Sequence, residues 1–136
     1  MTKLSAVVIS RKYHFSLNHP IDADGSRDSN DFGGVDNFGH GLNYTLEAFL
    51  SGPINQDTGM VVNLRDVDTW IKNVTLEFRD KNLEQTKQLL NIKPTLENLC
   101  AYFFKELQKQ ISLGDVNLEK VKLSLMDSAY AEYGSL

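Results

Sequence analysis

Two histidines, His19 and His40, are residues of this chain whose type and position could bind a metal ion. Neutral imidazole is an ordinary metal ligand in proteins. Leu42 follows His40 by two residues, and side chains two apart in a strand point the same way. Leucine has no lone pair and cannot bind a metal. Two interpretations stay open: a residual metal site at His19 and His40, or two histidines kept for local hydrogen bonding.

Arg79 and Asp80 form a second group that could do chemistry. A guanidinium suits carboxylates and phosphates, so this pair could act in acid–base chemistry or clamp an anionic ligand. The alternative is a solvated helix end. His14 lies five residues before His19, so strand alternation puts these two histidines on opposite faces unless a bulge intervenes.

Apolar residues at helical spacing predict two helices, over 64–78 and 95–111. Thr95 is the expected N-cap of the second helix. Cys100 lies on the apolar stripe of that helix, so we expect a buried thiol and not a nucleophile. Trp70 lies beside the apolar face of the first helix, where we expect it to pack or to form an interface.

The remaining elements are strands. Residues 4–17 and 42–51 are apolar and β-branched, residues 119–126 alternate apolar with polar side chains, and Tyr130 and Tyr133 mark a last short strand. The order strand, strand, helix, helix, strand, strand predicts an α+β fold. We expect an antiparallel four-stranded sheet covered on one face by two helices.

Length and composition limit the classes of protein to which this chain can belong. The 136 residues suit a single domain over 1–136. Eighteen acidic against fourteen basic side chains give a net charge of −4, which argues against a nucleic-acid surface. No apolar run approaches the roughly 20 residues of a membrane span, and the single cysteine excludes an internal disulfide, so we expect a cytoplasmic protein. The sheet would have two open edges, so we expect self-association by sheet extension.

Several sequence blocks, in order along almost the whole chain, resemble the 6-pyruvoyl tetrahydropterin synthase and 6-carboxytetrahydropterin synthase family. Together they make a specific signal, although any one alone is weak. The resemblance implies the tunnelling fold (T-fold), whose subunits join their sheets into a β-barrel, usually as trimers stacked into hexamers. The blocks are Phe15–His19, His40–Tyr44, Gly52–Ile54 with Thr58–Val61, Asp80–Glu84, Pro94–Asn98 and Lys120–Leu123.

The resemblance also implies a zinc ion held by three histidines, which keeps an open position and polarises substrate oxygens as a Lewis acid. His19 and His40 match two of these ligands, and Leu42 stands at the position of the third. Loss of one ligand in three removes most of the affinity. We therefore expect no bound cofactor, with zinc binding weakened.

Three further positions depart from the family pattern. Val35 stands where a cysteine base is implied, and Arg79-Asp80 replaces an Asp-His pair. Leu125 replaces a glutamate that accepts two hydrogen bonds from the guanidine-like edge of a pterin, and leucine would leave those donors unpaired. Asp127 could take over this role, because a two-residue offset keeps the same strand face. The alternative is a surface aspartate at a strand end.

These changes within an intact scaffold predict a family protein that is inactive in, or repurposed from, the reaction on dihydroneopterin triphosphate. A second hypothesis is an active carbon–oxygen or carbon–carbon lyase that uses substituted residues. Its candidates are Arg79, Asp80 and Asp127, with His19 and His40. A third hypothesis is a structural subunit that assembles with itself or with an active paralogue.

Overall fold

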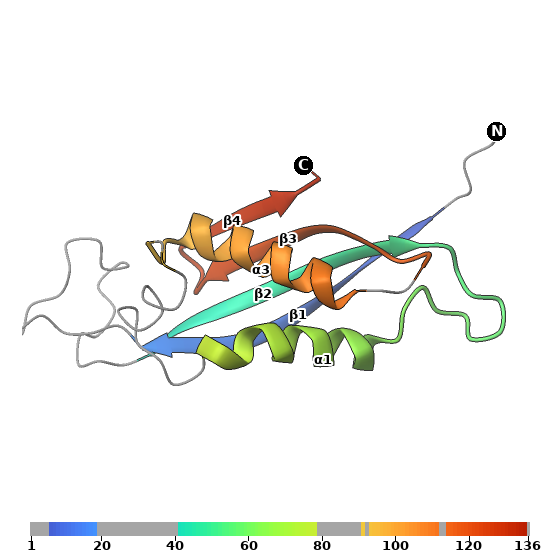
Figure 1. Ribbon diagram of the computed structural model, residues 1–136, viewed down its shortest axis with the longest axis horizontal. Helices are drawn as coiled ribbons and strands as arrows, with labels where there is room; N and C mark the ends of the chain where they lie inside the picture. Colours follow the sequence, from blue (N-terminus) through green and yellow to red (C-terminus); the bar gives the residue numbers. More distant parts are fainter. Residues whose placement is uncertain (1–5, 19–40, 79–90, 92, 112–113, 136) are drawn as a thin grey trace, which may run out of the picture.

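The fold is a four-stranded antiparallel sheet with helices on one face (Figure 1). It is seen in a computed structural model that describes residues 6–18, 41–78, 91, 93–111 and 114–135. The strand order is β1-β2-β3-β4, so each strand pairs with its neighbour in the chain. The predicted α+β class and order of elements are confirmed. The strands are β1 (Val7–Asn18), β2 (Gly41–Gly52), β3 (Asn117–Leu125) and β4 (Ala129–Gly134).

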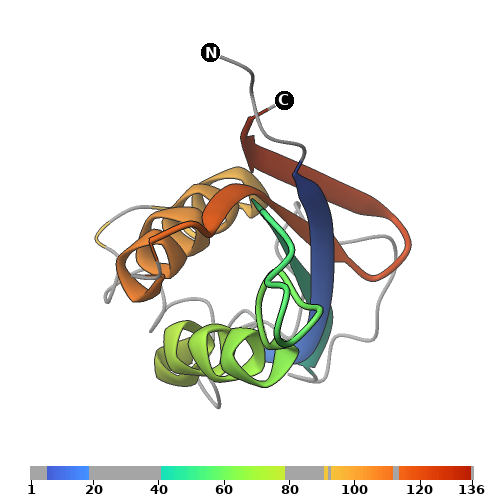
Figure 2. The same ribbon diagram turned by 90° about the vertical axis from the view of Figure 1, so that its right-hand side faces the viewer.

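Both predicted helices form, and both lie against the same face of the sheet (Figure 2). Helix α1 (Leu64–Thr75) is extended by a 3₁₀ turn (Leu76–Phe78). Helix α3 (Leu96–Gln110) begins after Thr95, whose hydroxyl accepts a hydrogen bond from the Asn98 N–H at 3.1 Å. The predicted N-cap is therefore confirmed. None of the helices in the described residues is long and apolar enough to cross a membrane.

The core lies between the sheet and the two helices. On β2 and β3, buried residues alternate with partly exposed ones, as expected for a sheet with one covered face. The helices contribute the apolar stripes that their spacing predicted. The large side chains buried most completely are Phe78, Phe103, Leu46, Leu50, Ile71, Leu99, Leu107, Leu123 and Leu125.

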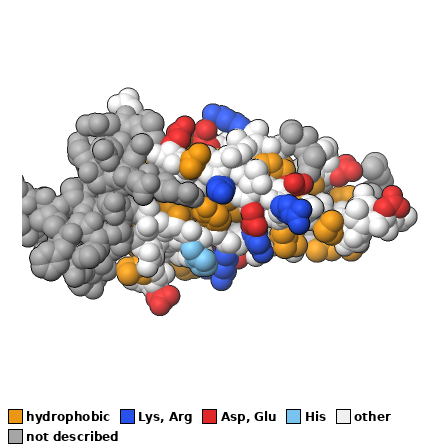
Figure 3. Space-filling model, turned by 90° about the horizontal axis from the view of Figure 1, so that it is seen from below, with side chains coloured by type: hydrophobic (Ala, Val, Ile, Leu, Met, Phe, Trp, Pro, Cys, Tyr) orange, Lys and Arg blue, Asp and Glu red, His pale blue; other side chains and the backbone are white. Residues whose placement is uncertain are grey.

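The other face of the sheet is polar and carries a row of alternating charges. Lys12 on β1 is the register partner of Glu47 on β2, which pairs in turn with Lys122 on β3 and Glu132 on β4. Opposite charges side by side on neighbouring strands stabilise a sheet, whereas like charges would destabilise it. We call these four residues the charge row. Seen from below, the surface mixes both signs of charge with apolar side chains (Figure 3).

An ion pair connects the first strand to the first helix. The Arg11 guanidinium donates two hydrogen bonds to the Asp68 carboxylate, at 2.7 and 2.8 Å. The hydrogen bonds from Arg11 lower the pKa of Asp68 below its usual value. The attraction between the two opposite charges lowers this pKa further, by a smaller amount. The ion pair fixes α1 across the edge strand β1, which has a neighbouring strand on one side only within the described sheet.

Candidate functional site

The end of β1, the start of β2 and the end of β3 meet at one end of the sheet. Asn18 and Gly41 are register partners, as are Leu17 and Leu42. Two steps further into the sheet, Tyr44 pairs with Phe15 on one side and with Leu125 on the other. We call this region the site end, because the blocks around Phe15, Tyr44 and Leu125 carry the predicted functional positions.

Several predicted site residues lie outside the described residues. They are His19, His40, Val35, Arg79 and Asp80. Their roles in metal binding, acid–base chemistry or ligand clamping stay predictions. Asn18 and Gly41, which flank the undescribed segment 19–40, are register partners on neighbouring strands.

Leu125 is a core residue. Its relative exposure is 0 %, and it belongs to the hydrophobic cluster shared by the sheet and both helices. Met126 then adopts a left-handed backbone with φ of 51° and donates its N–H to the Asn43 carbonyl at 2.9 Å. Strand β3 therefore ends with a buried hydrocarbon side chain, where the family pattern implies a carboxylate.

The expectation that Asp127 shares a strand face with Leu125 is wrong. Strand β3 ends at Leu125, and Asp127 lies exposed in the turn to β4. The Ser128 N–H and hydroxyl both donate to the Leu125 carbonyl, and Ala129 is already the register partner of Leu125. The positive φ of Met126 reverses the chain, so the two-residue alternation of a strand no longer applies. A role for Asp127 in chemistry stays a prediction.

Packed aromatic rings line the covered side of the site end. Phe15 stacks on Tyr44 with a centroid distance of 5.5 Å and meets the edge of Phe103 at 5.6 Å. Phe103 also makes an edge contact with Phe78 at 5.4 Å. Burial raises the pKa of the Tyr44 hydroxyl well above its usual value, so this group stays protonated. The sequence blocks had included Phe15 and Tyr44 without assigning them this packing role.

The described residues do not complete a metal site. Among them, no group of three or more histidine, cysteine, aspartate or glutamate side chains is arranged to hold an ion. His14, the one histidine they include, lies on the polar face, and its Nδ1 is 2.8 Å from the Thr45 hydroxyl. Its neighbours Tyr13 and Phe15 are partly buried and pack against the core on the other face. Leu42, at the position of the third implied ligand, has its backbone in β2 and offers no donor atom.

Two residues that could be mistaken for functional groups have structural roles. Cys100 is 1 % exposed, and its Sγ donates weak hydrogen bonds to the Val121 and Ala131 carbonyls at 3.4 Å each. The predicted burial of Cys100 is therefore confirmed, and this burial raises the pKa of the thiol to about 11. Asn98 donates its side-chain amide to the Lys93 carbonyl at 3.0 Å, beside the Thr95 cap.

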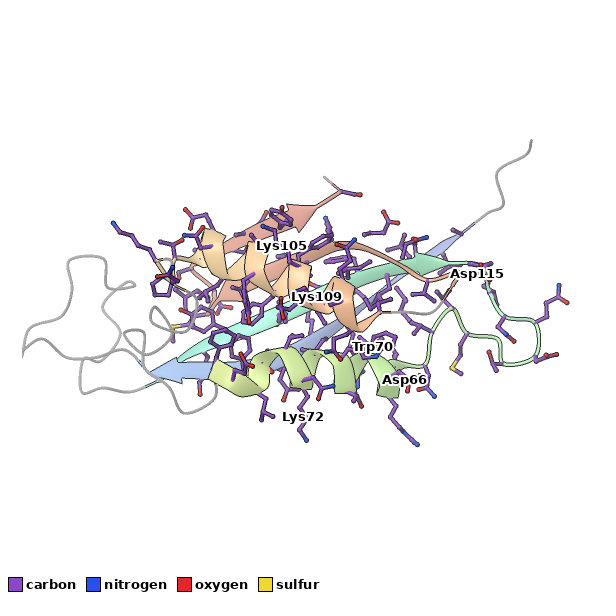
Figure 4. The ribbon with its side chains drawn as sticks, in the orientation of Figure 1. Asp66, Trp70, Lys72, Lys105, Lys109 and Asp115 are labelled. Carbon is purple, nitrogen blue, oxygen red and sulfur yellow. The ribbon has the colours of Figure 1, made fainter. Side chains whose placement is uncertain are left out.

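The labelled polar side chains of the helices, Asp66, Lys72, Lys105 and Lys109, are spread along α1 and α3 and do not converge on one point (Figure 4). On α1, Trp70 lies on the side facing α3 and packs against the core, as predicted, while Lys72 points to solvent. Asn73 on the same helix donates to the Gln110 side chain of α3 at 3.2 Å. These contacts hold the helices together and do not converge on a ligand.

Known proteins are similar to this chain in sequence and in fold. The 6-pyruvoyl tetrahydropterin synthase family matches residues 8–135. The 6-pyruvoyl tetrahydrobiopterin synthase of Drosophila melanogaster is 32% identical over 129 residues, which cover 90% of this chain and 76% of the relative. The human protein of that name is 31% identical over 131 residues, covering 92% and 89% of the two chains.

Solved structures agree. The Caenorhabditis elegans 6-pyruvoyl tetrahydropterin synthase superposes with a TM-score of 0.73 and 25% identity, covering 100% of both chains. A Plasmodium vivax structure, 19% identical with a TM-score of 0.65, supports the fold alone. The match over nearly all residues, the strand order and the helix-covered sheet lead to one conclusion: this chain belongs to the 6-pyruvoyl tetrahydropterin synthase family.

Proposed function

We propose that this protein is a tetrahydropterin synthase relative that does not carry out the family reaction on dihydroneopterin triphosphate. It is either inactive or repurposed for another ligand. The observation that carries this proposal is the complete burial of Leu125 in the hydrophobic core. A pterin held at this position would need an acceptor for its guanidine-like edge, and a leucine methyl group cannot accept a hydrogen bond.

The metal side of the proposal rests on Leu42. A three-ligand zinc site that loses one imidazole keeps two protein ligands, too few for the open catalytic geometry. His14 is not a replacement, because its ring bonds to Thr45 on the polar face. We therefore derive no catalytic step through zinc for this chain. If His19 and His40 bind an ion, they do so as a weakened site.

The chemical test compares this protein with an active relative. Purified protein, supplied with zinc and dihydroneopterin triphosphate, is assayed for tetrahydropterin product beside the Drosophila melanogaster enzyme as positive control. Zinc content is measured in both proteins, purified without chelators or affinity tags. We expect product and near-stoichiometric zinc for the control and neither for this chain. A tetrahydropterin product at a rate comparable to the control would overturn the proposal.

A second candidate is a lyase that uses substituted residues. Asp127 favours it, since its carboxylate lies exposed in the turn that follows β3, next to the site end. This enzyme would use Arg79 to hold an anionic substrate and Asp80 or Asp127 in acid–base chemistry. It predicts a bell-shaped dependence of the rate on pH. Unchanged activity in both Asp80→Asn and Asp127→Asn variants, for any reaction found, would eliminate this candidate.

A further inference from the structure

Among the described residues, Tyr44 carries a buried side-chain hydroxyl that has no hydrogen-bond partner. The other two buried hydroxyls are paired. Ser51 is 7% exposed and donates to the Glu119 carboxylate at 2.6 Å, and Thr75 is 3% exposed and donates to the Ile71 carbonyl at 2.9 Å. Tyr44 is 2% exposed, and no residue in the described ranges forms a hydrogen bond with its hydroxyl. Buried polar groups are nearly always paired, so this exception needs a physical reason.

The hydroxyl of Tyr44 is costly to the fold. Burial is the cause that raises the pKa of this group, with no contribution from a hydrogen bond, which agrees with the lack of a partner. A phenylalanine at this position would keep the stacked contact with Phe15, at 5.5 Å between ring centroids, without the cost of an unpaired polar group. Packing therefore explains the ring of Tyr44 but not its hydroxyl. A polar group that the fold does not need is typical of a functional site.

Tyr44 lies at the position where a ligand group would be expected. It is directly opposite Leu125 in the register of β2 and β3, and both side chains are buried on the covered face of the sheet. Directly opposed side chains on one face have Cβ atoms about 4.5–5.5 Å apart. Tyr44 is also three residues from Gly41, where β2 begins. The Tyr44 side chain therefore lies next to the position at which the resemblance implies a ligand-anchoring glutamate.

The hydrogen-bonding character of this position differs from the implied one. A glutamate carboxylate is an acceptor, which suits the donors on the guanidine-like edge of a pterin. Leu125 offers no hydrogen-bonding group, whereas the Tyr44 hydroxyl keeps its proton and offers a donor. A donor fits a carbonyl oxygen. The rings of Phe15 and Phe103 beside it favour an uncharged, planar molecule, because a charge in these surroundings would lose its hydration.

We propose that the Tyr44 hydroxyl donates a hydrogen bond to a carbonyl oxygen of a neutral, planar heterocycle bound at the site end. This inference rests on the proposed function, because it names the class of ligand for which the protein is repurposed. A simple molecule of this class is lumazine, the pteridine in which a carbonyl replaces the 2-amino group of a pterin. On the edge that a pterin offers to a carboxylate, lumazine has one donor group fewer and one acceptor more.

The first test asks whether the hydroxyl is unpaired in the ligand-free protein. Tyr44→Phe is compared with Tyr130→Phe, which removes a hydroxyl from an exposed side chain. We expect Tyr44→Phe to raise the melting temperature by about 2–4 °C, because it removes a buried group without a partner, and Tyr130→Phe to change it by less than about 1 °C. An unchanged or lower melting temperature for Tyr44→Phe would mean that a residue or a bound water satisfies the hydroxyl, and would overturn the inference.

The second test is a pair of titrations followed by ligand fluorescence. Lumazine and pterin are each added to the wild-type protein, to Tyr44→Phe and to Tyr130→Phe. We expect wild type to bind one lumazine per chain at least about tenfold more tightly than pterin, since pterin leaves an additional donor unpaired. Tyr44→Phe should bind lumazine at least about tenfold more weakly than wild type, whereas Tyr130→Phe should match wild type.

The outcomes separate this inference from the proposed function. Equal affinity of wild type and Tyr44→Phe for lumazine, or no binding of lumazine to wild type, would overturn the ligand class and leave the proposed loss of the family reaction intact. Pterin binding as tight as that of lumazine would also overturn the inference. Whether the family reaction persists is decided separately, by the assay for tetrahydropterin product from dihydroneopterin triphosphate.

Discussion

Leu123 lies in the middle of β3, and Leu125 lies at the site end of the same strand, yet their environments are alike. Both have 0 % exposure, and both belong to the cluster between sheet and helices. The resemblance to the family implies a ligand-anchoring glutamate at position 125, whereas this chain has a leucine there. Leu125 belongs to the core in the same way as Leu123. The side chain at the end of β3 therefore contributes to the packing and offers no hydrogen-bonding group.

The largest effect on stability is expected when a glutamate carboxylate is placed at position 125 or at position 123. Leu125→Glu and Leu123→Glu each place an ionisable group where the wild-type protein is dry and without a partner. We expect each to lower the free energy of unfolding by more than about 4 kcal/mol, measured by urea denaturation. A Leu125→Glu protein as stable as wild type, beside a destabilised Leu123→Glu protein, would mean that position 125 still opens onto a solvated pocket.

Truncation of an aromatic side chain at the site end is expected to lower the free energy of unfolding by a slightly smaller amount. Phe103 contacts Phe15, Phe78 and Tyr102. Truncation to alanine leaves a cavity at the junction of β1 and α3, so we expect Phe103→Ala to cost about 3–4 kcal/mol. The matched control is Phe49→Ala on the polar face, which should cost less than half as much. Equal losses would show that the covered side of the site end is loosely packed.

The start of α3 tests whether Thr95 acts as a helix cap or as part of a ligand site. Thr95→Ala removes the acceptor of the Asn98 N–H, so we expect a loss of about 1 kcal/mol in thermal or urea unfolding. Thr95→Ser retains the acceptor and should stay close to wild type. If the alanine variant matches wild type in stability, the cap contributes nothing to the fold, and Thr95 would have another role.

The smallest expected effect concerns pH. Because Arg11 lowers the pKa of Asp68 in the folded protein, the unfolded chain takes up this proton first as pH falls. The stabilisation by the ion pair is thus fully present above the pKa that Asp68 has in the unfolded chain. It is lost as pH falls through the lower pKa that Asp68 has in the folded protein. We expect Asp68→Asn to be less stable than wild type at pH 7 and to differ less at pH 3. A constant difference across this range would remove the ion pair as its cause.

The sequence predicted most of the fold because its elements obey simple periodicities. Val67, Ile71 and Val74 are spaced for one helix face, and all three are buried. The alternation at Val121 and Leu123 likewise identified the covered face of β3. What the residues could not reveal was register, because the partner of a strand residue depends on the whole sheet. The bulge between Phe49 and Leu50 and the order of the charge row appear only in the structure.

The candidate site was less predictable than the fold. Asp127 was expected to continue the strand, since Met126 has no preference for a left-handed turn that would reveal the end of β3. The burial of Leu125 could be expected from its place in the alternating pattern. Its contrast with a ligand-anchoring role came only from the resemblance to the family.

One titration decides whether the hydrocarbon core at the site end excludes a pterin. Dihydroneopterin triphosphate is added to the zinc-supplemented protein and followed by ligand fluorescence, with the Drosophila melanogaster enzyme measured in parallel. Burial of Leu125 predicts no saturable binding to this chain at ligand concentrations that saturate the control. Saturable binding of one ligand per chain, at an affinity close to that of the control, would contradict the loss of the pterin anchor.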